Sequence, residues 1–174
     1  MLVPSGDRWG LPGTFLHEGE LLVEAAQRAL RARAGLTRVV PRQLHVFDAV
    51  DRDDRGRVLS IAHLVGVAWD RLGSMGPATV VDVGAAGPLR WDHGQIIERA
   101  VAEMRRTYRR SPDPFRLLAE PFTLRDLQTL HEAVAGERLM RDSFRRRMEP
   151  QVTPTGDMAR GTVGKPARLF TRTR

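Results

Sequence analysis

The sequence predicts an α+β protein of two domains, and three observations support this prediction. The first 110 residues contain segments with the periodicity of helices and others with the composition of strands. A proline-containing segment at 111–121 then interrupts this pattern. It is followed by two short helical segments and a glycine-containing hairpin, the order of a winged helix-turn-helix. We therefore expect a first domain at 1–110, a linker at 111–121 and a second domain at 122–174.

Composition restricts the class of protein. The chain has 174 residues, of which 41% are hydrophobic, and this is enough for a buried core. No run approaches the ~20 apolar residues that cross a bilayer, and the first residues lack the order of a signal peptide. We therefore expect a cytoplasmic protein with no membrane partner. The absence of cysteine excludes disulfides, thiolate metal sites and cysteine nucleophiles.

Positive charge is concentrated at the C-terminal end. Residues 121–174 contain 11 basic and 6 acidic side chains, so 11 − 6 = +5 of the net charge of +7 lies there. Such a segment indicates a polyanionic partner, either nucleic acid or an anionic membrane surface. A solvated basic tail is the alternative.

Local signals predict the elements of the first domain. Residues 20–34 favour a helix, which Gly35 is expected to end. Its apolar side consists of Leu22, Ala26 and Leu30. The segments 43–50 and 58–69 carry β-branched and aromatic residues on either side of a polar turn, which predicts a β-hairpin. A weaker strand is expected at 79–83, and a further helix at 93–108.

The second domain has the signals of a winged helix-turn-helix. Thr123 is expected to cap a helix that reaches Ala135 and ends at Gly136, and a second helix is expected at 141–149. The segment 152–171 places proline and glycine between strand-like ends, as in a long hairpin.

The second of these helices is expected to read DNA. Phe144 and Met148 lie four residues apart and should face the core, so the arginines between them point outward. Outward arginines can bind phosphates and guanine edges in the major groove, and basic residues of the wing can follow the backbone or enter the minor groove. The expected DNA contacts are Arg141, Ser143, Arg145, Arg146, Arg147, Arg160, Lys165 and Arg168. A solvated basic face is the alternative.

The segment 9–36 resembles the Nudix box, a motif of glycine, glutamate and arginine at fixed spacing followed by three carboxylates. The residues at the box positions are Thr14, Glu20, Arg28, Ala29, Ala32, Arg33 and Gly35. The resemblance implies that Ala29, Ala32 and Arg33 stand where the family's carboxylates hold magnesium, and the three share one helix face. Magnesium requires anionic oxygen ligands, and an arginine adds positive charge beside it. We therefore expect no metal, no catalytic residues and no hydrolysis.

Further segments extend the resemblance over almost the whole chain. They lie at 43–47, 55–62, 91–93, 120–124 and 164–170. Together they resemble the Nudix-related transcriptional regulators of NAD metabolism, in which a degenerate Nudix domain senses an ADP-ribose-type ligand and a winged helix binds operator DNA. The resemblance implies an α/β/α sandwich with a mixed sheet. Only eight residues precede Trp9 where the family has several tens, so either the chain starts upstream or the first strand is missing.

The resemblance also implies partners and site residues. The expected protein is a repressor of NAD metabolism genes, responsive to ADP-ribose or a related metabolite and homodimeric on palindromic double-stranded DNA. Trp9, Glu20 and Arg28 are the candidate ligand contacts, with Arg28 paired to Glu20 to hold the loop. Two alternatives remain. One is an active Nudix hydrolase of ADP-ribose or another nucleoside diphosphate derivative, and the other is a nucleic-acid-binding module without sequence preference.

Overall fold

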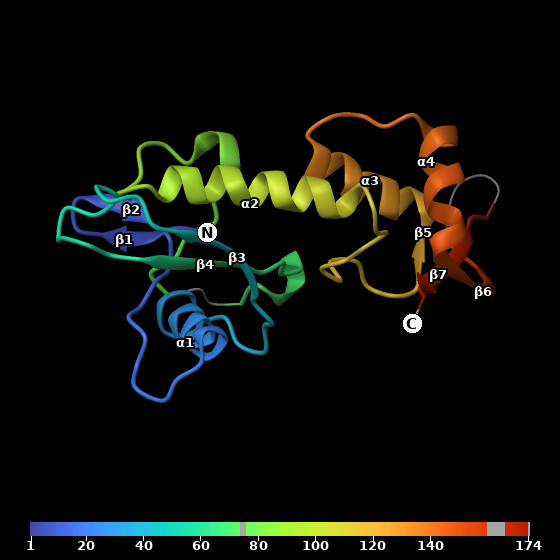
Figure 1. The fold of residues 1–174 in the computed structure, drawn as a ribbon. Coiled ribbons are helices and arrows are strands. Elements are labelled where there is room, and N and C mark those ends of the chain that lie inside the picture. The colour runs from blue at the N-terminus through green and yellow to red at the C-terminus, as the bar shows by residue number, and fades with distance from the viewer. Residues whose placement is uncertain (74–75, 160–165, 174) are drawn as a thin grey trace. The chain divides into compact units, whose positions relative to one another are not determined.

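A computed structural model describes residues 1–73, 76–159 and 166–173 (Figure 1). The chain forms two compact units, residues 1–100 and 101–174. Both contain helices and strands, which confirms the predicted α+β class. The boundary between the units falls inside helix α2 (His93–Tyr108), whereas the sequence places the end of the first domain at residue 110. No helix of the described residues is long and apolar enough to cross a membrane.

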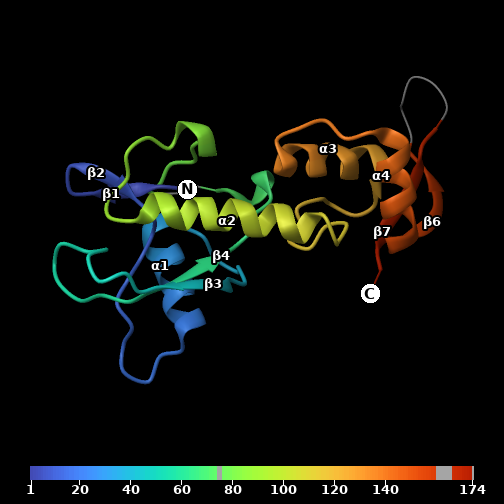
Figure 2. The ribbon, with the colours of Figure 1, turned by 45° about the horizontal axis from the view of Figure 1, so that its top comes forward.

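The described residues of unit 1 form two antiparallel strand pairs. Its elements are β1 (Val3–Ser5), β2 (Arg8–Gly10), α1 (Leu22–Ala34), β3 (Arg42–Phe47), β4 (Ser60–Leu64), the short helices η1 (Trp69–Arg71) and η2 (Val83–Ala85), and the start of α2. Strand β1 pairs with β2, and β3 with β4, as Figure 2 shows. The predicted hairpin of β3 and β4 is therefore confirmed. The strands form two separate ladders where a single mixed sheet is expected, and a parallel bridge joins Trp9 to Leu89.

The strand predicted at 79–83 is wrong. Only Thr79 forms a bridge, to Leu2, and Val83 begins a 3-10 helix instead. The Asp82 carboxylate accepts a hydrogen bond from the Gly84 amide at 2.9 Å. This local contact caps the turn and stabilises it against an extended conformation.

Helix α1 forms where it is predicted, and Leu30 of its predicted apolar side packs against the core of unit 1. Gly35 ends it in the left-handed conformation, with φ of 64°, which glycine adopts without a steric penalty. The buried side chains are those of Ala25, Ala29 and Ala34, whereas Leu22 is exposed. Small side chains therefore bring this helix close to its neighbours. The core of unit 1 contains Val3, Ala34, Leu36, Val39 and Ala78.

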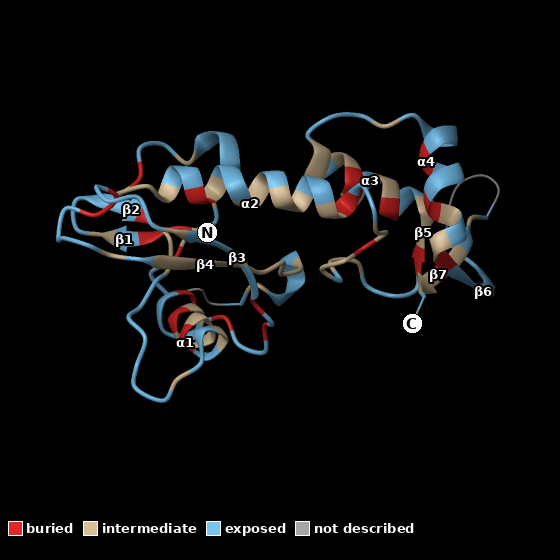
Figure 3. Ribbon diagram, viewed as in Figure 1, coloured by how far each residue is buried: buried red, intermediate tan, exposed pale blue. Residues whose placement is uncertain are grey.

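Unit 2 is a winged helix. Its elements are the end of α2, β5 (Phe122–Thr123), α3 (Leu124–Ala135), α4 (Arg141–Met148), the short helix η3 (Glu149–Gln151), β6 (Val152–Met158) and β7 (Arg168–Arg172). The sheet has the order β5-β7-β6 and is antiparallel. Thr123 caps α3 as predicted, because its hydroxyl accepts a hydrogen bond from the Asp126 amide at 3.1 Å. The core, red in Figure 3, contains Phe122, Leu127, Phe144, Met148, Val152 and Phe170.

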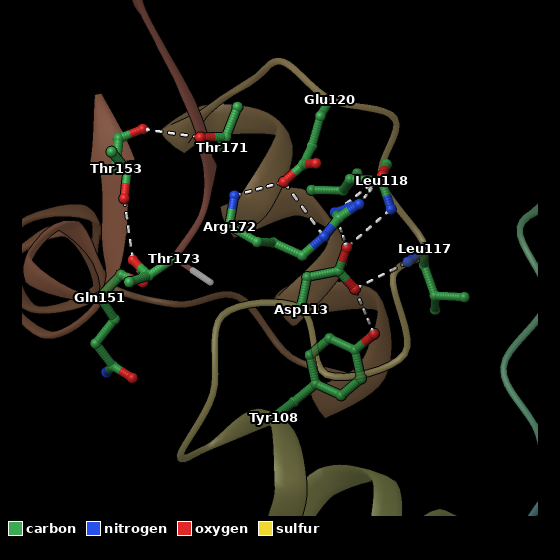
Figure 4. A network of polar contacts seen from close by, with 10 residues as sticks. All are labelled: Tyr108, Asp113, Leu117, Leu118, Glu120, Gln151, Thr153, Thr171, Arg172 and Thr173. Carbon is green, nitrogen blue, oxygen red and sulfur yellow. Dashed lines mark hydrogen bonds and ion pairs between the residues drawn. The ribbon is translucent and has the colours of Figure 1, made fainter. Parts of the chain in front are cut away.

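The segment 111–121, predicted as a linker, is anchored to unit 2 through Asp113 (Figure 4). The Asp113 carboxylate is fully buried and accepts hydrogen bonds from the Tyr108 hydroxyl and the Leu117 and Leu118 amides. Arg172, on the last strand, donates to the same carboxylate at 2.9 Å. The segment 111–121 and the last strand of unit 2 are therefore joined by one buried anion.

Candidate functional site

One arginine organises the loop before α1. The Arg28 guanidinium donates Nε and Nη2 to the two carboxylate oxygens of Glu20, at 2.8 and 2.7 Å. Its Nη1 donates to the Thr14 hydroxyl and Nη2 also to the Phe15 carbonyl, both at 2.8 Å. The pair of Arg28 and Glu20 expected from the spacing is present. Thr14, at the position of a box glycine, supplies an acceptor to the same network.

This network keeps Glu20 ionised. Hydrogen bonds from Arg28 lower the pKa of Glu20 from 4.5 to about 2. Both carboxylate oxygens already accept hydrogen bonds, one of them also from the His17 amide at 3.1 Å. Glu20 and Arg28 therefore hold the loop, and their contact with a ligand stays a prediction.

The box positions without carboxylates do not form one exposed cluster. Ala29 is 5% exposed, whereas Ala32 and Arg33 lie on the solvent side of α1. The shared face expected from helical spacing is divided because the packed side of the helix passes through Ala29. Within the described residues, no three His, Cys, Asp or Glu side chains are placed to hold a metal ion.

A cluster of aromatic and charged side chains in unit 1 was not predicted. The Arg55 guanidinium lies 4.4 Å from the centroid of the Trp91 ring and 5.7 Å from that of Phe15. It also donates two hydrogen bonds to Asp53, at 2.9 and 2.7 Å. The Trp91 indole donates to Asp54 at 2.9 Å. A guanidinium between aromatic rings can offer both charge and a stacking surface to a nucleotide.

Buried polar contacts hold the backbone beside this cluster. Trp91 has a φ of 51°, a region that bulky side chains rarely adopt. The neighbouring Asp92 accepts two hydrogen bonds from Arg52, at 2.9 and 2.6 Å, and both side chains are less than 10% exposed. His93 accepts a hydrogen bond from the Leu11 amide at Nδ1, and burial lowers the pKa of His93. Forty residues separate Arg52 from Asp92, so local sequence signals could not find this pair.

Trp9, a candidate ligand contact, lies on β2 and is 42% exposed. Its backbone carbonyl accepts a hydrogen bond from the Arg90 amide at 3.0 Å. The backbone of Trp9 is therefore joined to the residue that directly precedes Trp91. Stacking of a ligand on Trp9 stays a prediction.

In unit 2, the outer face of α4 is basic. Phe144 and Met148 face the core as predicted, with 2% and 0% exposure. The predicted DNA contacts on this helix are exposed, pale blue in Figure 3: Arg141, Ser143, Arg145, Arg146 and Arg147. In the part of the chain that the structure describes, the guanidinium groups of Arg141, Arg146 and Arg147 have no hydrogen-bond or ion-pair partner.

Arg145 differs because it is paired within its own helix. Its Nε donates to the Glu149 carboxylate at 2.6 Å. Arg168, on β7, approaches the other oxygen of the same carboxylate at 3.6 Å and is 67% exposed. The other two predicted wing contacts, Arg160 and Lys165, lie outside the described residues.

Comparison with known proteins identifies the family. Residues 114–171 match the family model described as the NrtR DNA-binding winged helix domain. The chain is also similar to Shewanella oneidensis NrtR, solved in complex with a 27mer DNA. The two share 30% identity and a TM-score of 0.76, over 99% of this chain and 85% of that one. This chain belongs to the NrtR family.

Other similar proteins are named for ADP-ribose or were solved in complex with it. The ADPR responsive transcriptional repressor NtrR of Acinetobacter baylyi is 25% identical, over 96% of this chain and 70% of its own length. The NUDIX domain of S. oneidensis NrtR, solved in complex with ADP ribose, has a TM-score of 0.52 at 25% identity, over 59% of this chain and 75% of that one. The ADP-ribose pyrophosphatase of Methanocaldococcus jannaschii is 33% identical, over 52% of this chain and 55% of its own length. The predicted NrtR-type fold, a Nudix-like unit followed by a winged helix, is thus confirmed.

Proposed function

We propose that this NrtR-family protein is a transcriptional repressor that binds operator DNA and senses ADP-ribose or a related NAD metabolite. The observation that carries the proposal is the exposed arginine face of α4, within the region that matches the NrtR DNA-binding winged helix domain. Arginines on a recognition helix can donate to phosphates and to guanine edges. Arg141, Arg146 and Arg147 are among the proposed contacts, and their guanidinium groups have no protein partner among the described residues.

Unit 1 is proposed to hold the effector. The relatives that respond to or bind ADP-ribose support this role. Trp9 and the Arg55–Trp91 cluster supply aromatic surfaces on which the adenine ring of such a ligand can stack. Glu20 and Arg28 hold the adjoining loop in place. The Nudix-like fold serves recognition in this arrangement.

The effector is proposed to be bound without being hydrolysed. Ala29, Ala32 and Arg33 replace the carboxylates that the resemblance assigns to magnesium, and no cluster of metal ligands occurs in the described residues. The similarity to an ADP-ribose pyrophosphatase makes hydrolysis the second candidate function. Magnesium-dependent turnover of ADP-ribose by the purified protein, abolished by Glu20→Gln, would establish the hydrolase.

The repressor is proposed to act as a homodimer on genes of NAD metabolism. A two-fold symmetric protein reads palindromic half-sites about one helical turn apart, or a multiple of it. Sedimentation of the protein alone and on DNA tests the dimer.

A gel shift tests the proposed function directly. The probe is the region upstream of the protein's own gene, with a scrambled duplex as the competitor. We expect a preference of ~10³-fold or more for the upstream region, and a change in affinity when ADP-ribose is added. Arg146→Ala should weaken the complex, whereas Arg99→Ala, which removes an exposed arginine of unit 1, should not. Equal affinity for both duplexes would contradict a specific repressor.

A further inference from the structure

The carboxylate of Glu149 lies between two arginines, at the end of the helix proposed to read DNA. Oε2 accepts a hydrogen bond from Arg145 Nε at 2.6 Å, and Oε1 lies 3.6 Å from Nη1 of Arg168 on β7. The Glu149 side chain is 26% exposed, while those of Arg145 and Arg168 are 60% and 67% exposed. One anion thus connects α4 with a strand of the wing.

The stability of α4 does not explain why residue 149 is a glutamate. Glu149 directly follows the last residue of α4, where the helix dipole disfavours negative charge. Arginine four residues before glutamate is also the weaker order for a helical ion pair, and exposed pairs contribute little to stability. On the DNA-facing helix, an anion in addition repels phosphates. We therefore expect Glu149 to have a role other than stabilising the helix.

The geometry of the Arg145–Glu149 pair indicates this role. The hydrogen bond occupies Nε of Arg145 and leaves both Nη groups without a protein partner among the described residues. Two Nη donors on one planar edge match the O6 and N7 acceptors of a guanine. A guanidinium held through Nε loses less conformational freedom when this edge binds, because its rotamer is already selected.

We propose that Glu149 is a positioning residue for DNA specificity. It holds Arg145 through Nε so that the Nη edge points outward to a guanine, and it joins the base of the wing through Arg168. This inference rests on the proposed function, since it assumes that α4 enters the major groove. It adds the claim that an acidic side chain, whose charge opposes DNA binding, increases discrimination between sequences.

Selection from a random pool of DNA duplexes tests this inference. The full-length wild-type chain first enriches its preferred duplex, and affinities for that duplex and a scrambled one are then measured for Glu149→Ala and Arg145→Ala. Asp142→Ala is the matched control, because Asp142 is an exposed carboxylate on α4 that makes no hydrogen bond with Arg145. Glu149→Gln is the conservative variant, since its amide oxygen can still accept from Nε.

The results differ according to whether Glu149 positions Arg145 or acts only through its negative charge. If Glu149 positions Arg145, Glu149→Ala lowers the ratio of preferred to scrambled affinity about tenfold, and Glu149→Gln restores part of it. In the Arg145→Ala background, Glu149→Ala then leaves the ratio unchanged. Asp142→Ala should strengthen binding to both duplexes equally. If Glu149→Ala behaves like Asp142→Ala, or if no coupling to Arg145 is found, the inference is overturned while the proposed function stands. If the wild-type chain enriches no sequence, both are overturned.

Discussion

Replacement of Asp113 by alanine should destabilise unit 2 strongly. The side chain is fully buried and accepts hydrogen bonds from Tyr108, Leu117, Leu118 and Arg172. Removing one partner of a buried ion pair costs about 3–5 kcal/mol, because the other charge is left uncompensated. Each backbone amide that loses its acceptor adds about 1–3 kcal/mol unless water replaces the carboxylate.

The surroundings of Arg172 reduce this cost. Its side chain is 21% exposed, and its guanidinium also lies 3.3 Å from the Glu120 carboxylate and donates to the Leu118 carbonyl at 3.0 and 3.2 Å. Part of its charge therefore stays compensated in the variant. We expect the free energy of unfolding to fall by about 4 kcal/mol, which corresponds to roughly a thousandfold change in the unfolding equilibrium. Asp113→Asn keeps the volume and one acceptor oxygen, so about half of this loss is expected.

Urea denaturation provides the assay. Far-UV circular dichroism follows the helices of both units. All three tryptophans lie in unit 1, so their fluorescence reports on that unit alone. The circular dichroism midpoint should shift more than the fluorescence midpoint. Asp142→Ala, at an exposed position, is the control. A loss below about 1 kcal/mol for Asp113→Ala, or one equal to the control, would refute the reasoning.

Three further predictions concern the proposed sites. If Arg146 reads a guanine, Arg146→Ala should weaken binding to the operator by about 1–3 kcal/mol and binding to unrelated DNA far less. Equal losses on both duplexes across a salt series would show that the side chain contributes only its charge. Calorimetry should detect no magnesium binding by the wild-type chain, and the combination Ala29→Glu, Ala32→Glu and Arg33→Glu should raise the affinity; tight binding by the wild type would contradict our reading of the box. Because Arg28 lowers the pKa of Glu20 from 4.5 to about 2, the stabilisation by this pair is fully present above pH 4.5 and is lost as the pH falls toward 2. Urea midpoints of wild type and Glu20→Gln should converge over this range, and parallel curves would show that the pair has no such effect.

Local features of the sequence were sufficient for much of the secondary structure. Gly35 and Gly136 end α1 and α3 in the left-handed conformation, and Thr123 caps α3. These signals act within one or two turns of a helix, so they can be read without knowing the tertiary fold. The burial of Phe144 and Met148 follows from their spacing for the same reason.

Two expectations failed in part because packing against neighbouring elements and local hydrogen bonds outweighed the hydrophobic pattern. The apolar side of α1 was assigned to Leu22, Ala26 and Leu30. Leu30 packs against the core, but Leu22 is exposed, and the small side chains of Ala25 and Ala29 are buried instead. The strand at 79–83 gave way to the turn that Asp82 caps. Hydrophobicity alone does not decide which residues along one side of a helix a neighbouring element covers.

The sequence by itself determined the α+β class, the caps of α1 and α3, the box without its carboxylates and the basic helix of the winged domain. Each of these depends on residue type and on spacing within a few turns. Only the tertiary structure decided that Arg145 is hydrogen-bonded to Glu149 while the Arg146 guanidinium has no partner among the described residues, and that Asp113 accepts a hydrogen bond from Arg172. Asp113 and Arg172 are 59 residues apart, and such a contact exists only after the intervening chain has folded and excluded water from both groups.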